Sequence, residues 1–277
     1  MSLSITHSLA EVKNVLQSEK NLVNANLQNY DFSGEDFRNV NLSNANLISV
    51  NFSFAKLEGA NLENADLRGA CLQNANLSGA NLTNALLQRS QLEGANLTEA
   101  NLTGAKLDLA YYSSETQWPE DFKYTKSGAV GPRASLSGAF LNTANLRGVD
   151  LTGANLRGAY MSGADLTGAN LSNAALSGAD LKYAFLTGAN LENSTFVSAE
   201  LEGADLRATN LTNANFENLQ SIAGADFTLA QGLNEKTRSI FYSFSSEDLN
   251  KWNTFTRNNT KNSLEGLRSN DLIVNSQ

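Results

Sequence analysis

The stretch Asn21-Leu-Val-Asn-Ala-Asn-Leu-Gln-Asn-Tyr-Asp-Phe32 begins a run in which a hydrophobic residue occupies every fifth position without interruption up to Leu107. A second run keeps the same period from Leu136 to Phe216. A period of five matches neither the about 3.6 residues of an α-helical turn nor the alternation of a β-strand. Each pentad must therefore contain its own change of direction, and repetition on this scale fixes the architecture.

Two further columns accompany the central hydrophobic residue of each pentad. A small residue precedes it by two positions, as at Ala60 and Ala154, and Gly or Asn follows it by two positions, as at Asn64 and Gly158. Gly and Asn most readily adopt the positive φ that the third residue of a type II turn requires. The pattern predicts that each pentad is a short extended side followed by a corner, with the central and small residues pointing inward.

These pentads resemble those of a known family. Ala45-Asn-Leu-Ile-Ser49, Ala65-Asp-Leu-Arg-Gly69 and Ala100-Asn-Leu-Thr-Gly104 look like the A(D/N)LXX unit of pentapeptide repeat proteins. The resemblance implies an all-β solenoid, a right-handed quadrilateral β-helix in which four pentads make one coil. It is also consistent with a cyanobacterial source. In the small-residue column, Tyr30, Glu35, Val40 and Val50 depart from the pattern, so the first coil or two are expected to be less regular.

A coil of four pentads brings residues twenty positions apart into contact. The bulky pairs at this spacing are Phe32 with Phe52, Phe196 with Phe216 and, just before the central position, Phe140 with Tyr160. They predict like-on-like stacking between coils about 4.8 Å apart.

Both ends of the chain carry helix signals. Ser8 and Glu11 have the spacing of a capping box, as do Ser245 and Asp248. Short helical caps are expected because an open β-helix end exposes unpaired backbone groups. The predicted segments are an N-terminal helical cap at 1–20, a first repeat block at 21–114, an inserted loop at 115–133, a second repeat block at 134–230, a C-terminal helical cap at 231–257 and a flexible tail at 258–277.

The inserted loop is the main irregularity of the sequence, since it contains both prolines and Trp118. We expect Trp118 and Phe122 to fold back and cover Phe140 and Tyr160, which stand where the repeat prefers Asp or Asn. The alternative is that the loop presents its aromatic residues to a partner. These four residues are the candidate protein-binding residues.

The C-terminal aromatic residues Trp252 and Phe255 also have two interpretations. They are expected to pack on the last coil, in keeping with a monomer. The alternative is a C-terminal dimer, because family members that bind gyrase pair through this end.

Composition excludes several functions. The net charge is −8 without a basic patch, so no direct nucleic-acid binding is expected. One Cys excludes an internal disulfide, and no apolar stretch is long enough to cross a membrane, so the predicted location is the cytoplasm. The chain has one His and lacks metal-binding, phosphate-binding and nucleophile motifs. We therefore expect no catalytic, cofactor-binding or metal-binding residue, no cofactor and no enzyme activity.

The preferred hypothesis is a non-enzymatic structural or interaction protein, a rigid β-helical rod that presents flat faces and one loop to an unidentified protein partner. The first alternative is a DNA mimic that binds DNA gyrase, by resemblance to acidic members of the family. Against it stand the many Asn residues at positions where a mimic would benefit from Asp. The second alternative is an enzyme that uses a pocket formed by the loop.

Overall fold

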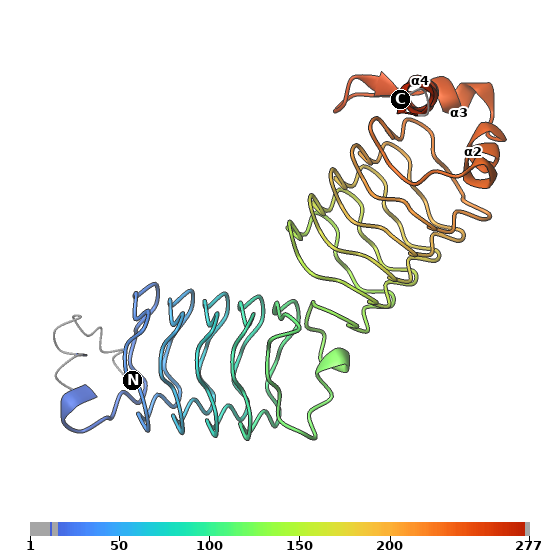
Figure 1. Ribbon diagram of the computed structural model, residues 1–277. Coiled ribbons are helices and arrows are strands. Elements are labelled where there is room, and N and C mark those ends of the chain that lie inside the picture. Colours follow the sequence, from blue (N-terminus) through green and yellow to red (C-terminus); the bar gives the residue numbers. More distant parts are fainter. Residues whose placement is uncertain (1–11, 13–15, 275–277) are drawn as a thin grey trace. The chain divides into compact units, whose positions relative to one another are not determined.

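Both parts of the chain are stacks of coils joined by isolated parallel β-bridges (Figure 1). The computed structural model describes residue 12 and residues 16–274, with the backbone alone over 268–274. The chain divides into two units, Met1–Gly131 and Pro132–Gln277. Most bridges join residues twenty positions apart, such as Asn21 with Asn41 in the first unit and Ser135 with Asn155 in the second. Four pentads therefore complete one coil, as the repeat predicts.

The core of each unit is a column of central Leu and Phe side chains lined by Ala. Leu77 and Leu166 are fully buried, and Val40 and Val50 are buried in the small-residue column of the early coils. The bridges there follow the same twenty-residue register, so the early coils are regular despite their departures.

The predicted stacking between coils is confirmed. The ring centroids lie 5.7 Å apart for Phe32 and Phe52, 4.9 Å for Phe196 and Phe216, and 5.0 Å for Phe140 and Tyr160.

The corners follow the predicted turn chemistry. One residue per pentad has positive φ, from Asn24 to Leu109 and from Arg133 to Asn218. The turn closes with a backbone hydrogen bond across it, as from the amide of Ala65 to the carbonyl of Leu62 at 3.0 Å. Most corner residues are Gly or Asn, but Phe54 also has a φ of 58°.

Side chains of Asn and Asp just before the central position support these corners. The Oδ1 atom of Asn41 accepts from the amide of Ser43 at 3.1 Å, and Oδ1 of Asp150 accepts from the amide of Thr152 at 3.0 Å. Asn side chains also bond between coils, as from Nδ2 of Asn61 to Oδ1 of Asn41 at 3.2 Å. Asn and Asp side chains at this position therefore stabilise the turns.

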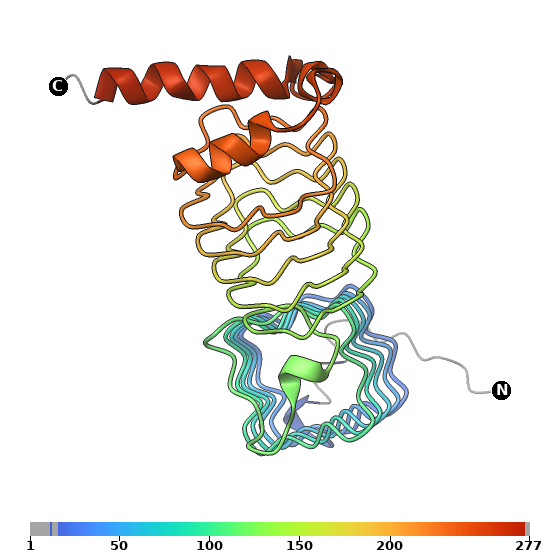
Figure 2. The same ribbon diagram turned by 90° about the vertical axis from the view of Figure 1, so that its right-hand side faces the viewer.

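The predicted inserted loop, 115–133, belongs partly to the last coil of the first unit. Gln117 bridges to Asn96, and Val130 bridges to Tyr111. Between them lies the short 3₁₀ helix η1, Tyr124–Lys126. In Figure 2, η1 is the green helix drawn within the four-sided outline of the coils of this unit.

The second unit ends in helices and a small sheet. After Phe216 one extra residue shifts the register, so that Asp205 bridges to Asp226. Helix α2 is Glu235–Tyr242, with Asn234 as N-cap, and helix α3 is Ser246–Asn250. The predicted cap at Ser245 is confirmed, since its Oγ accepts from the amide of Asp248 at 3.1 Å.

Beyond α3 the structure differs from the sequence prediction. Strand β1, Trp252–Asn253, pairs with β2, Asn258–Asn259, and helix α4 covers Thr260–Val274. The segment predicted to be a flexible tail from residue 258 thus forms β2 and α4, because Leu264 and Leu267 are buried. The expected packing of Trp252 and Phe255 on the last coil is wrong, since Trp252 is 56% exposed. Phe255 is 59% exposed, and its ring lies edge to face with that of Phe185, two coils before Asp226.

The predicted N-terminal cap at 1–20, with Ser8 and Glu11, lies largely outside the described residues. Within them, Val12 is buried and residues 16 and 17 are helical. Over the described part of the chain, helices are too short or too polar to cross a membrane.

Replacing Phe54 with Asn should stabilise the first unit by about 0.5–1 kcal/mol, because a left-handed backbone strains a bulky residue and suits Asn. The Phe54 ring is 65% exposed, so little packing is lost. Chemical denaturation of both proteins measures the difference. Phe54→Val is the control and should destabilise, since a β-branched residue tolerates this conformation poorly. Equal stability of the Asn and Val variants would contradict the strain argument.

Candidate protein-binding surfaces

The aromatic residues of the inserted loop form a cluster within the first unit. Trp118 stacks on Tyr124 at 5.4 Å and on Phe122 at 5.5 Å, and meets the ring of Tyr112 edge to face at 5.6 Å. Tyr112 is a buried member of the last coil's core. The cluster therefore covers the end of the hydrophobic column, and Trp118 and Phe122 anchor their own loop.

Phe140 and Tyr160 are exposed in the second unit. Their rings stack with an interplanar angle of 5°, and they remain 79% and 46% exposed, respectively. Within the first unit, Trp118 packs on Tyr112 and Tyr124, and Phe122 packs on Trp118. That these two side chains cover Phe140 and Tyr160 stays a prediction. Both members of the pair are bridge residues, whose side chains point out of the coil.

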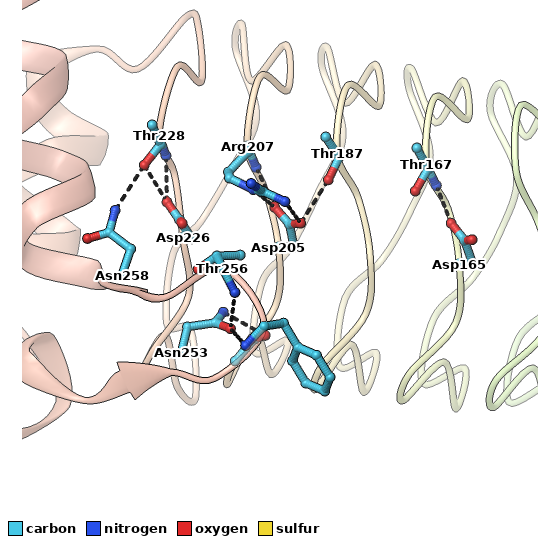
Figure 3. A network of polar contacts seen from close by, with 12 residues as sticks. Asp165, Thr167, Thr187, Asp205, Arg207, Asp226, Thr228, Asn253, Thr256 and Asn258 are labelled. Atoms are coloured by element: carbon cyan, nitrogen blue, oxygen red, sulfur yellow. Dashed lines mark hydrogen bonds and ion pairs between the residues drawn. The ribbon is translucent and has the colours of Figure 1, made fainter.

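A polar network follows one face of the second unit (Figure 3). Asp205 is buried and accepts hydrogen bonds from Nε and Nη2 of Arg207 at 2.8 and 2.7 Å and from Oγ1 of Thr187 at 2.8 Å. Burial raises the pKa of Asp205, but the bonds from Arg207 and Thr187 outweigh it and hold the pKa below its usual value. Asp165 is paired with Arg147 at 2.9 Å. These carboxylates are therefore neutralised locally.

The β1–β2 turn attaches the C-terminal segment to this unit. The buried side chain of Asn253 donates through Nδ2 to the carbonyls of Gly203 at 3.1 Å and Gly224 at 2.8 Å, and its Oδ1 accepts from the amides of Phe255 and Thr256 (Figure 3). Sequence reasoning missed this residue because a single Asn in a polar segment gives no periodic signal.

The first unit has an open groove of about 640 Å³ along one corner. The groove is lined by Ile48, Arg68, Gly69, Gln88, Arg89, Asp108 and Leu109. Sequence analysis did not single out these residues, since they come together only when coils stack. Among the described residues, His, Cys, Asp and Glu side chains do not gather in threes or more that could hold a metal ion.

The repeat is recognised by comparison with known proteins. A family model described as pentapeptide repeats matches the chain in eight copies, over segments that run from residue 21 to 111 and from 133 to 218. The chain belongs to the pentapeptide repeat family. No curated protein matches it significantly.

Several solved structures are similar. HetL, a pentapeptide repeat protein involved in heterocyst differentiation regulation in the cyanobacterium Nostoc sp. strain PCC 7120, is 28% identical, with 80% of this chain and 97% of HetL covered and a TM-score of 0.31. Rfr23 from the cyanobacterium Cyanothece 51142 is 42% identical over 35% of this chain and 63% of Rfr23, with a TM-score of 0.25. QnrB1, a plasmid-mediated fluoroquinolone resistance protein, is 18% identical over 79% of this chain and 95% of QnrB1, with a TM-score of 0.39.

Replacing Trp118 with Ala should destabilise the first unit by about 2 kcal/mol or more, because it opens the cluster that covers the core column. Hydrogen exchange of the amides from residue 92 to 112 measures the loss. Phe140→Ala is the control: an exposed ring should change stability by no more than about 0.5 kcal/mol. Unchanged protection in the Trp118 variant would show that the cluster does not hold the last coil.

Replacing Asp205 with Asn should destabilise the second unit by about 1–3 kcal/mol at pH 7, because hydrogen bonds to a charged group are lost. Since its native pKa is lowered, the carboxylate contributes stability above the unfolded value near about pH 4, and this contribution is lost as the pH falls through the native pKa. The variant and the wild type should thus converge in acid. Denaturation midpoints from pH 7 to 3 measure this, with exposed Asp121→Asn as the control. A difference that does not change with pH would contradict the assignment.

Proposed function

We propose that this chain is a non-enzymatic interaction protein, a right-handed quadrilateral β-helix whose exposed aromatic pair, Phe140 and Tyr160, contacts a protein partner. The observation that carries the proposal is the pair itself. It leaves two large rings open to solvent at positions that in most other pentads hold small or polar residues, such as Asn155 and Asp180.

The stacked geometry favours binding for two physical reasons. Aromatic side chains supply large contact areas and are enriched among the residues that dominate binding energies at interfaces. Phe140 and Tyr160 also hold each other nearly parallel. The two rings therefore lose less conformational freedom when a partner binds, which lowers the entropic cost of association.

The other interpretations have less support. A DNA mimic needs an array of free negative charge, whereas Asp165 and Asp205 are paired with Arg147 and Arg207. Gyrase binding is therefore the less favoured alternative. An enzyme with a loop-formed pocket is disfavoured because the loop's Trp118 is packed among aromatic rings.

Photo-crosslinking tests the proposal. We expect p-benzoylphenylalanine at position 140 to crosslink a protein partner in the native cells, and the same probe at the exposed control position 54 not to do so. The double variant Phe140→Asn, Tyr160→Asn should bind the purified partner at least about tenfold more weakly by calorimetry, with Phe54→Asn unchanged. The absence of a crosslink specific to position 140, or full affinity in a folded double variant, would refute the proposed surface.

A further inference from the structure

The groove in the first unit includes one corner without a side chain, Gly69. At this corner the positive-φ positions of successive coils are Ser49, Gly69, Arg89 and Leu109. A Cβ atom built on Gly69 would have one neighbour within 4 Å, Oγ of Ser49 at 3.4 Å. The space above Gly69 is therefore open, with larger side chains on the coils on either side.

The lining combines apolar and cationic groups. Ile48 and Leu109 are partly buried and supply apolar walls. Nε and Nη2 of Arg68 bond to Asp66 at 2.8 and 2.6 Å, which leaves Nη1 free for an acceptor from outside. Arg89 is exposed and has no ion pair within the described part of the chain.

The charges are arranged by coil. Arg68 and Arg89 lie on adjacent coils, and Asp108 lies on the next coil, where its backbone carbonyl accepts from the amide of Arg89 at 3.2 Å. Arg68 is already paired with Asp66, so the guanidinium of Arg89 is the main unpaired positive charge of the groove. The groove thus carries an unpaired positive charge, although the chain has a net charge of −8.

We propose that the groove binds an extended segment of a protein partner, with an acidic side chain on Arg89 and the adjacent apolar side chain in the hollow above Gly69. The inference rests on the proposed function in that the ligand is a protein, but it concerns a different surface. From Ile48 to Asp108 the groove crosses four coils. Three spacings of about 4.8 Å accommodate roughly four residues of an extended chain.

The apolar walls and the charge of the chain select this occupant. A nucleic acid would need several cations along its backbone and would be repelled by the overall negative charge. A peptide carboxylate needs one or two guanidinium groups, which pair with it in a directional way. Asp108 adds to the specificity for the peptide, because its negative charge repels a second acidic residue at that end of the groove.

Two matched pairs of variants isolate the hollow and the charge. Gly69→Asn fills the hollow, and Asn suits a corner with positive φ, as at Asn64. Gly79→Asn is its control, at a corner where a Cβ would meet nothing within 4 Å. Arg89→Asn removes the charge, and Glu99→Asn is its control, since both residues have a φ of 60° and are exposed.

A displayed library of random octapeptides is selected for binding to the wild-type protein. One enriched peptide is then synthesised, and its Kd is measured by fluorescence anisotropy. Wild type should enrich Asp or Glu next to an apolar residue. The Kd should rise at least tenfold in Gly69→Asn and Arg89→Asn and less than twofold in both controls, and added salt should weaken binding by the wild type more than by Arg89→Asn.

Failure takes a defined form. Lack of enrichment, enrichment of basic or uncharged peptides, or an unchanged Kd in the folded Gly69→Asn variant would overturn the groove proposal. The variant Phe140→Asn, Tyr160→Asn should keep the full affinity for the peptide. The crosslink at position 140 tests the other surface independently, so the two proposals can fail separately.

Discussion

The structure depends on backbone hydrogen bonds between coils, in a register that is twenty residues along most of each unit. The amide of Leu62 donates to the carbonyl of Asn81 at 2.7 Å, and the amide of Asn81 donates to the carbonyl of Ala60 at 2.9 Å. Where the register is twenty residues, this pattern requires each pentad to have the same length and one corner with positive φ. It explains why bulky residues such as Phe54 are held in a strained conformation: the neighbouring coils determine the backbone.

The same hydrogen bonding leaves open ends that other parts of the chain must cover. In the first unit, Trp118 and Tyr124 lie against Tyr112 at the end of the core column. In the second unit, α2 contributes Phe241, which packs on Phe227, and Thr260 at the start of α4 donates to the carbonyl of Ile222 at 3.0 Å. The C-terminal end of each unit is thus covered by aromatic packing, and side-chain hydrogen bonds assist in the second unit.

The repeating part could be predicted from the sequence, and the covering segments could be predicted only in part. The core column, the corners and the stacked pair Phe32 and Phe52 follow from a period, because each position is reinforced by its copies. The hydrogen bonds from Asn253 to Gly203 and Gly224, and the burial of Leu264 and Leu267 in α4, depend on single contacts over long sequence separations. A single sequence contains no copies of such contacts. At the C-terminus it therefore predicts the helix start at Ser245, but not the strands β1 and β2 or helix α4.

The same reasoning explains where binding features arise in a repeat. A regular pentad satisfies its own polar groups, as the Asn41 and Asn61 ladder does, and so offers a partner few unmet interactions. Recognition then depends on departures from the repeat. Phe140 and Tyr160 are visible in the sequence because they replace polar residues in one column. The groove at Gly69 is not visible in the sequence, because Gly is common at a corner. The hollow depends on the size of the side chains on the adjacent coils.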